Sequence, residues 1–480
     1  LEHGGMLILT SLDYELQMQM ICILAAQTEK LGVSTVQPPT TKQCTADRLL
    51  PALESPRVDE EIYAQALALE PQSGHILALV DAAPYTAAGE LLAAHPVGAL
   101  ATPFIYLTAF TRGLGPASLV WDIPPEDAQE LEAERLAEYH GPVRLRLALA
   151  NDYLQPAEQL LAQVGVENVW RAAQQFGVLS PQNSEDGEVN ALTFLRPVNL
   201  IEMSQAFGIL ANQGMLAGRP APPSAEELFF SGMQPPPIQP ITALRVEDAA
   251  GKVWLDWNVG QTRPIVDASL AYLITHVLSD ETARWPSLGH PNPLEIGRPA
   301  AAKVGGDPSQ HSAWVIGYTP DRLVGVWLGY AAAANPLPDV AVQAAMGVYH
   351  AAMKYANQNL PARPWPTPAG IVHVKVCDPS GMLPTAYCPN VVEEVFHSGN
   401  EPLQQDRLYQ SVAVNRETGR LATIFTPPDL IVDQPYMLVP PQAMEWAKRA
   451  GLSSPPDTYD TLTALSSQSS QVQITSPRMF

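Results

Sequence analysis

Two pairs of strand-like segments, far apart in the chain, enclose a long helical stretch, and this order constrains the fold more than any other feature of the sequence. The first pair, 62–69 and 75–80, consists of apolar runs on either side of the turn-forming residues 70–74, which predicts a β-hairpin. The last pair, 313–318 and 322–330, flanks a Thr-Pro-Asp turn. Strands, then helices, then strands predict an α+β layer structure with antiparallel pairing, and they argue against a βαβ repeat.

The residues between the two pairs carry mainly helical patterns. An apolar stretch at 99–112 predicts a helix that Gly113 ends, and helical spacing runs from about 143 to 213. Two further strands and a helix are predicted before the last pair, at 241–247, 252–256 and 267–279. We therefore expect an antiparallel sheet flanked by helices, with a helical subdomain.

Proline marks the irregular parts of the chain. It accounts for 47 of the 480 residues and clusters at 219–240, 361–368 and 427–456, which indicates a long surface loop and an irregular C-terminal region. We therefore expect three regions along the chain: a lead-in or linker segment at 1–60, the sheet-and-helix domain at 61–358, and a Pro-rich C-terminal extension at 359–480.

Composition excludes some classes of partner. Acidic residues outnumber basic ones 49 to 27, and the resulting net charge of -22 repels phosphate backbones, so we expect no nucleic-acid partner. The sequence contains no run of 18 or more apolar residues, so no segment is predicted to span a membrane. Because the chain opens at Leu1 without an initiator Met, we expect it to belong to a longer protein whose membrane anchor or signal peptide lies upstream.

The cysteines and histidines do not predict a metal site or a cofactor. No two cysteines form a CxxC pair, which argues against zinc and against a thioredoxin-type redox site. Cys377 and Cys388 bracket a short loop, and either a disulfide in an oxidising compartment or two reduced buried thiols fits that spacing. Whether Cys22 and Cys44 pair stays open. The histidines also lack metal-ligand spacing, among them His3, His276, His290 and His350.

The segment 300–330 resembles the K-T-G strand and the following hairpin of the penicillin-binding proteins, in which Ser-x-x-K, Ser-x-Asn and K-T-G motifs meet in one cleft. Further segments resemble other parts of that family, and together they extend over roughly residues 4–450: 4–17, 70–80, 96–110, 141–165 and 376–389. The resemblance is to the transpeptidase domain of bifunctional, class A members. It implies the fold of the serine β-lactamases and D,D-transpeptidases, and an upstream glycosyltransferase.

The catalytic residues of the family do not carry over to this chain. When Gly98 and residues 103–104 are aligned with the family's first motif, Ala99 stands at the position of the serine and Thr102 at the position of the lysine of Ser-x-x-K. The second motif has become Asp152 and Leu154 in place of serine and asparagine. The third motif survives in part, because a lysine and a glycine remain but a valine replaces the threonine; it reads Lys303, Val304, Gly305 and Gly306. None of the lysines lies three residues after a serine.

These replacements predict a pseudo-transpeptidase. The methyl group of Ala99 cannot form the acyl-enzyme with a D-Ala-D-Ala peptide or a penicillin, and Thr102 is not a base near neutral pH. Val304 lacks the hydroxyl that would hold the substrate carboxylate. Loss of a covalent nucleophile lowers kcat by about 10⁶, so we expect no acylation by β-lactams.

Two alternatives keep a function in the cleft. Thr102 could act as a substitute nucleophile, with Lys303 as its base, in a weak carboxypeptidase or transpeptidase. Alternatively, Lys303 could pair with a terminal carboxylate in a stem-peptide receptor without chemistry. If neither alternative holds, we expect the domain to serve as a scaffold or binding module. In all three cases the resemblance implies an extracytoplasmic protein of the cell envelope, whose partners are peptidoglycan, its stem peptides or other cell-wall assembly proteins.

Four further expectations concern individual side chains. Because Asp152 replaces the serine that faces Lys303 in the family, we predict an ion pair between them that closes the cleft. The envelope location favours a disulfide between Cys377 and Cys388. We interpret His95 and His311 as solvated loop residues. The aromatic residues at strand spacing are predicted to pack in the core; these are Trp314, Tyr318, Trp327 and Tyr330.

Overall fold

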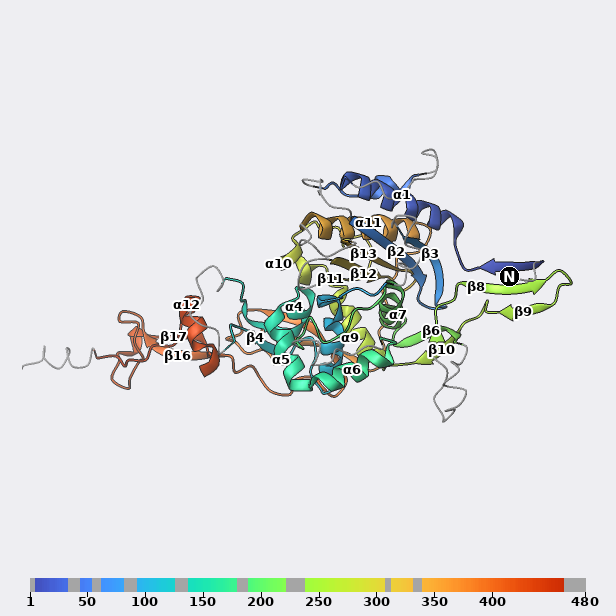
Figure 1. Cartoon of the computed structure of the whole chain (residues 1–480). Helices are drawn as coiled ribbons and strands as arrows, with labels where there is room; N and C mark the ends of the chain where they lie inside the picture. Colours follow the sequence, from blue (N-terminus) through green and yellow to red (C-terminus); the bar gives the residue numbers. More distant parts are fainter. Residues whose placement is uncertain are drawn as a thin grey trace, which may run out of the picture. The chain divides into compact units, whose positions relative to one another are not determined.

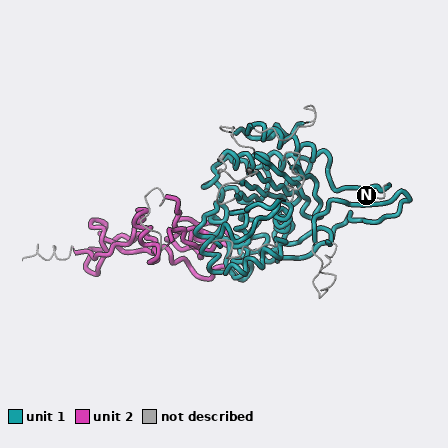
Figure 2. The backbone as a smooth tube through the Cα atoms, in the orientation of Figure 1, with its two compact units in different colours: residues 1–116, 145–372, 395–400 teal, residues 117–144, 373–394, 401–480 magenta. Residues whose placement is uncertain are grey.

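The structure is a computed structural model that describes nine stretches of the chain: residues 5–32, 44–53, 62–81, 93–125, 137–178, 189–221, 238–306, 312–330 and 339–461. The chain divides into two compact units, coloured teal and magenta in Figure 2. Unit 1 comprises residues 1–116, 145–372 and 395–400, and unit 2 comprises residues 117–144, 373–394 and 401–480. The boundaries expected from the sequence, at 60/61 and 358/359, stay a prediction.

Unit 1 is built on a five-stranded antiparallel sheet with the order β11-β12-β13-β2-β3 (Figure 1). The hairpin and the last strand pair predicted from the sequence are both present. Their strands are β2 (Ile62–Glu70), β3 (His75–Asp81), β12 (Ser312–Tyr318) and β13 (Leu323–Tyr330). The two pairs join because β13 lies antiparallel to β2, with Leu323 opposite Leu69. The last strand is β11 (Ala301–Gly306), which pairs with β12 and forms one end of the sheet.

Two helices cover one face of this sheet. They are α1 (Tyr14–Lys30) and α11 (Asp339–Ala356), and Figure 1 shows both on the same side of the strands. Met20, Ile23 and Leu24 of α1 are fully buried and share one apolar cluster with sheet residues such as Val315 and Val326. Residues 1–60 were expected to form a lead-in segment, but they supply a helix of the core. The apolar side chains of this helix, α1, bury the outer side of α11.

The other face of the sheet carries the helical subdomain. Its elements are η3 (Ala99–Ala101), α2 (Thr102–Phe110), α4 (Leu145–Ala150), α5 (Leu154–Val164), α6 (Val166–Gln175), α7 (Leu200–Ala211), α9 (Ala268–Leu278), η5 (Thr282–Arg284) and α10 (Trp285–Leu288). All nine residues of α2 are buried, which explains its continuously apolar sequence. The helix predicted at 99–112 is thus divided into a 3₁₀ turn and an α-helix. The helical pattern assigned from 143 begins two residues too early, because Val143 and Arg144 end a strand.

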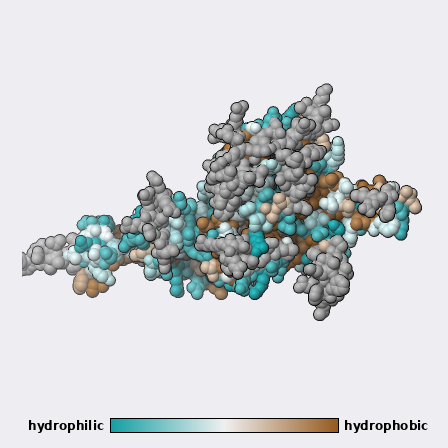
Figure 3. Space-filling model, in the orientation of Figure 1, coloured by the Kyte–Doolittle hydropathy of each residue, from teal (hydrophilic) through white to brown (hydrophobic). Residues whose placement is uncertain are grey.

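Unit 1 also contains two three-stranded sheets. The first has the order β1-β8-β9, with β1 (Met6–Thr10), β8 (Ala243–Asp248) and β9 (Val253–Asp256). The second has the order β10-β6-β7, with β10 (Gln261–Pro264), β6 (Met215–Pro220) and β7 (Ile238–Gln239). Strands near 241–247 and 252–256 were predicted, but the pairing of β8 with β1 was not. Strand β1 is exposed throughout, and Figure 3 shows apolar residues at the surface in this region.

In its described residues, unit 2 consists of short strand pairs, one short α-helix and two 3₁₀ turns. It contains β4 (Leu119–Asp122) with β5 (Gly141–Arg144), β16 (Tyr409–Asn415) with β17 (Ile431–Met437), and α12 (Met444–Arg449). It also contains residues 373–377 of β14 (Ile371–Cys377) and 391–394 of β15 (Val391–His397). The Pro-rich extension is therefore more regular than expected. Among the described residues β17 pairs only with β16, and the other edge of this strand can accommodate Pro435.

Covalent and ionic links stabilise both units. Cys377 and Cys388 form a disulfide, as expected from the sequence, and Cys22 and Cys44 form a second one, so no free cysteine remains. In unit 2, the Arg144 guanidinium lies 2.7 Å from Asp378 and 2.6 Å from the buried Glu394. These contacts connect β5 to the C-terminal part of the chain. Within the described ranges, no helix has the length and apolarity needed to cross a membrane.

Candidate functional site

The positions expected to carry the three motifs come together on unit 1. Ala99 and Thr102 lie at the start of α2, and Asp152 and Leu154 lie where α4 passes into α5. The third motif forms β11, at the open end of the five-stranded sheet. The carboxylate of Asp152 contacts the ammonium of Lys303, and Gly98 forms a β-bridge with Gly306. The three segments therefore enclose one site.

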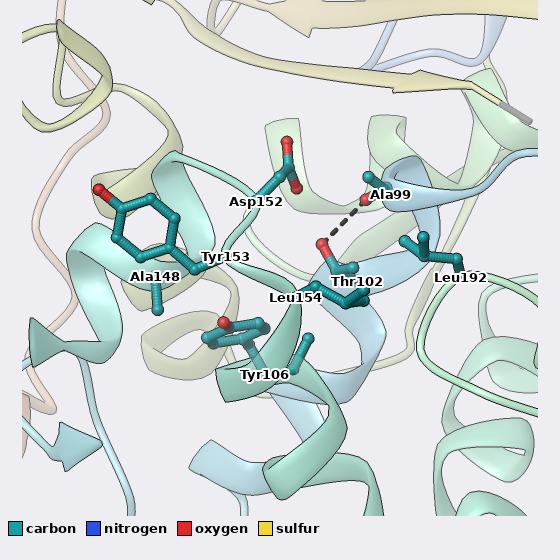
Figure 4. A pocket seen from close by; sticks show the side chains of 9 residues that line it. Ala99, Thr102, Tyr106, Ala148, Asp152, Tyr153, Leu154 and Leu192 are labelled. Carbon is teal, nitrogen blue, oxygen red and sulfur yellow. Dashed lines mark hydrogen bonds between the residues drawn. The ribbon is translucent and has the colours of Figure 1, made fainter. Parts of the chain in front are cut away.

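Thr102 is held in a way that does not suit a nucleophile. Its side chain is buried, and its hydroxyl donates a hydrogen bond of 2.9 Å to the Ala99 carbonyl oxygen (Figure 4). A nucleophilic hydroxyl must give its proton to a base, and this proton is directed to a backbone carbonyl instead. Ala99 provides only a methyl group at the position where the resemblance predicts the family's serine.

Lys303 is buried inside the site and is hydrogen-bonded there. Only 2% of its side-chain surface is exposed, and its ammonium donates one hydrogen bond to the Leu149 carbonyl oxygen at 3.0 Å and another to the Asp152 carboxylate. Burial lowers the pKa of the Lys303 ammonium, the charge of Asp152 opposes that shift, and the positive charge of Arg284 adds to it. The ion pair predicted from the sequence is confirmed.

Asn151 positions the aspartate that pairs with Lys303. Its buried side chain donates to the carbonyl oxygens of Leu147 (2.9 Å) and Ala283 (2.7 Å), and it accepts a bond from the Ser287 backbone N–H (3.0 Å). These bonds tie the end of α4 to η5 and α10. The next residue, Asp152, has a φ of +58°, a left-handed conformation that turns its side chain back toward β11. Sequence reasoning missed Asn151, because nothing in its local pattern distinguishes it from a helix C-cap.

The outer edge of β11 is covered by the chain itself. Edge strands present unpaired backbone groups on which an extended peptide can dock. Here Gly98 forms a parallel bridge with Gly306 along that edge. A Cβ atom on Gly98 would lie 1.6 Å from the Gly306 carbonyl oxygen, and one on Gly305 would lie 2.5 Å from Leu100 Cβ. The backbone around Gly98 therefore occupies the place of an added strand at 305–306.

The space that remains in the site is small. A cavity of about 10 Å³ is left, which is about the space that one water molecule requires. Pockets for small-molecule ligands typically measure about 300–1,000 Å³. Figure 4 shows the side chains around the cavity, which is lined by Ala99, Thr102, Tyr106, Ala148, Asp152, Tyr153, Leu154, Ala157 and Leu192. The remaining cavity is therefore much smaller than a typical ligand pocket.

Arg284 is a second cation near the site that sequence reasoning missed. It is 2% exposed and donates a hydrogen bond to the Leu278 carbonyl oxygen, and burial lowers its pKa. Its charge acts on Lys303 even though η5 and β11 are separate elements. No pattern in the sequence links the two residues, because only the tertiary fold brings them together.

The interpretation of His95 as a solvated loop residue is wrong. Its ring stacks on Trp327, with 3.6 Å between centroids and 17° between planes, and burial lowers its pKa from 6.5 to about 4. The expected packing role is confirmed for Trp314, Tyr318 and Trp327, which are all buried. The side chain of Tyr330 and all of His311 lie outside the described residues. Across the described ranges, no group of three potential metal ligands is found.

Comparisons with known proteins agree with this arrangement. A family model described as "Penicillin-binding protein 1A, C-terminal domain" matches residues 367–411. Penicillin-binding protein 1A of Clostridium botulinum is 24% identical over 310 residues, which cover 62% of this chain and 34% of that protein. The chain thus spans about a third of the length of this relative.

Solved structures with a similar fold come from the same family. Penicillin-binding protein 1A from Haemophilus influenzae has a TM-score of 0.63 at 17% identity, covering 84% of this chain and 73% of that chain. PonA1 of Mycobacterium tuberculosis, in complex with penicillin V, has a TM-score of 0.56 at 18% identity, covering 76% and 89%. The matched sequences, the shared fold and the motif positions around Lys303 agree: the chain is similar to the class A penicillin-binding proteins and has the fold of their transpeptidase-type domain.

Proposed function

We propose that this chain is a non-catalytic, transpeptidase-like domain that acts as a scaffold or binding module in peptidoglycan assembly. The observation that carries the proposal is Ala99, a methyl group at the position of the acylated serine. Acyl transfer by a covalent route requires a nucleophile, and its loss reduces turnover by about 10⁶.

The surroundings of Thr102 support this proposal over a substitute enzyme. The Thr102 hydroxyl donates to the Ala99 carbonyl, while the ammonium of Lys303 donates to Asp152 and to the Leu149 carbonyl. Burial lowers the pKa of Lys303 and Asp152 opposes that shift, but a base must also offer its lone pair to the hydroxyl, and the Lys303 nitrogen is directed to Asp152 and to the Leu149 carbonyl. The arrangement therefore does not favour proton transfer from Thr102 to Lys303.

The same ion pair argues against a stem-peptide receptor in the cleft. A peptide carboxylate would have to pair with the ammonium of Lys303, and that ammonium is already paired with Asp152. The cavity of about 10 Å³ leaves no room for a terminal D-Ala residue. We therefore place any binding of partners on other surfaces of the domain.

We further propose that the domain functions in the cell envelope. Two disulfides account for all four cysteines, and disulfides persist in oxidising, extracytoplasmic compartments. The net charge of -22 disfavours nucleic acid as a partner. The partners we propose are peptidoglycan and other cell-wall assembly proteins, in a longer protein that carries a glycosyltransferase and a membrane anchor upstream.

Fluorescent penicillin tests the loss of catalysis. The purified domain and an active class A penicillin-binding protein are incubated with the label, denatured and separated on a gel. We expect label on the active protein and none on this chain, with intact mass spectrometry showing no adduct. A stoichiometric adduct at Thr102 or at any other residue would overturn the proposal, provided a cooperative thermal transition shows that the sample is folded.

Calorimetric titration with a peptide that ends in D-Ala-D-Ala separates the receptor from the scaffold. We expect no binding to the wild-type domain, because Lys303 is paired. Binding that is lost in K303M would favour the receptor instead.

A further inference from the structure

A second cavity in unit 1 lies at the far end of the helix that carries Thr102. It measures about 250 Å³, some 25 times the volume left in the motif cleft. It is formed between the C-terminal end of α2 and one side of α6, with Val266 completing the wall. None of the positions discussed as motif residues lines it, so it is independent of the proposed function.

The floor of this cavity is apolar and rigid. Leu107 and Phe176 are 3% and 2% exposed, and Ala172 and Val266 lie beside them in the lining. Phe176 is held by an edge-to-face contact with Phe104, with 5.4 Å between the ring centroids. An apolar group of a ligand would therefore meet a preformed surface.

The rim carries two guanidinium groups. Arg112 donates one hydrogen bond of 3.3 Å to the Gln163 carbonyl oxygen. Arg171 donates one of 3.4 Å to the Asn168 side chain and lies 3.6 Å from the carboxylate of Glu167. Each guanidinium has five N–H donors, and these few long contacts leave most of them available.

The charge of the rim is opposite to that of the chain. The cavity lining contains two arginines and no acidic residue, in a protein with a net charge of -22. Guanidinium groups recognise carboxylates through two parallel N–H···O bonds. We propose that this pocket, which Arg112 and Arg171 border, binds a small organic carboxylate that carries an apolar group.

The arginines could instead have only a structural role. Arg112 follows the C-terminal end of α2, where a positive charge stabilises the helix dipole, and Arg171 pairs with Glu167 one turn earlier on α6. That role predicts a lower melting temperature on substitution and no specific uptake of carboxylates. The two roles therefore differ in a binding measurement.

Calorimetry on the whole chain with three probes provides this measurement. The probes are 3-phenylpropionate, its neutral amide, and acetate, at equal ionic strength. We expect 3-phenylpropionate to bind most tightly, because the amide lacks the charge and acetate lacks the apolar group. In R112Q and in R171Q the Kd of 3-phenylpropionate should rise by about ten-fold or more, because each variant loses a hydrogen bond to the charged carboxylate. The control variant R416Q, with an exposed arginine of unit 2, should bind like wild type.

Two outcomes would overturn this proposal. One is equal affinity for 3-phenylpropionate and its amide, or no binding of either. The other is an unchanged Kd in folded R112Q and R171Q, with or without a lower melting temperature, which would leave the arginines a structural role only.

Discussion

The carboxylate of Asp152 accepts a hydrogen bond from the ammonium of Lys303, across the cleft where the family's second and third motifs meet. Lys303 is almost completely buried, whereas Asp152 keeps 30% of its side-chain surface exposed at the rim. Burial lowers the pKa of Lys303 and raises the pKa of Asp152, and their mutual attraction offsets part of the cost that an unpaired charge would have at that depth.

The first prediction concerns this pair. We expect D152N to lower the free energy of unfolding by about 2–3 kcal/mol, less than the about 3–5 kcal/mol of a fully buried pair, because Asp152 is partly exposed. Urea unfolding at pH 7 measures the change. In a double-mutant cycle with K303M, the coupling energy should reach at least about 1 kcal/mol. A coupling energy near zero would mean that the contact does not contribute to stability.

The second prediction is that restoring the nucleophile alone does not restore acylation. In A99S the new hydroxyl would have no base, because Thr102 follows at the lysine position and Lys303 is paired. Fluorescent penicillin should therefore leave A99S unlabelled, as we expect for wild type. Labelling of A99S would show that the serine is the only missing element and that the cleft can open.

The third prediction concerns His95 and pH. Its folded-state pKa of about 4 lies below the ordinary value of 6.5, so the unfolded state binds a proton between these values while the folded state does not. The stability contributed by the neutral ring is complete above pH 6.5 and is lost as pH falls toward 4. We expect H95F, which keeps a ring against Trp327, to lose less stability between pH 7 and pH 4.5 than wild type. Equal losses, measured by urea unfolding at both pH values, would contradict the lowered pKa.

The fourth prediction tests the cover on β11. Gly98 has φ +50° and ψ -129°, and an added Cβ would clash with the Gly306 carbonyl oxygen at 1.6 Å. Gly289, with φ +70° and ψ -176°, has no atom within 4 Å of an added Cβ and serves as the control. We expect G98A to lower the midpoint of thermal unfolding more than G289A does. If the two variants lose the same stability, the bridge between Gly98 and Gly306 is not tight.

The fifth prediction concerns the disulfide of unit 2. Cys377 and Cys388 are 11 positions apart, and closing a loop of this size restricts the unfolded chain. We expect the double variant C377A/C388A to lose about 2–3 kcal/mol of stability. Denaturant unfolding of this variant, beside wild type under oxidising conditions, checks the value. An unchanged midpoint would show that the loop is held by other contacts.

The sequence by itself determined the local elements and the absence of a Ser-x-x-K motif. The hairpin of β2 and β3 follows from apolar runs around a turn, and the turn before β13 is stabilised by the Thr319 hydroxyl, which accepts from the backbone N–H groups of Asp321 and Arg322. The replacement of the serine by Ala99 needs no coordinates, because the motif is defined by spacing along one helix. The ion pair between Lys303 and Asp152 could also be predicted, because the family fold brings those two positions together.

Only the tertiary structure determined which distant segments pack against one another. The pairing of β13 with β2, the bridge between Gly98 and Gly306, and the charge of Arg284 beside Lys303 all join residues from separate elements. Local patterns report which face of a strand or helix is apolar, but not which distant segment packs against it. The burial of His95 against Trp327 was misjudged for the same reason, since a lone histidine in a loop gives no local sign of the ring that covers it.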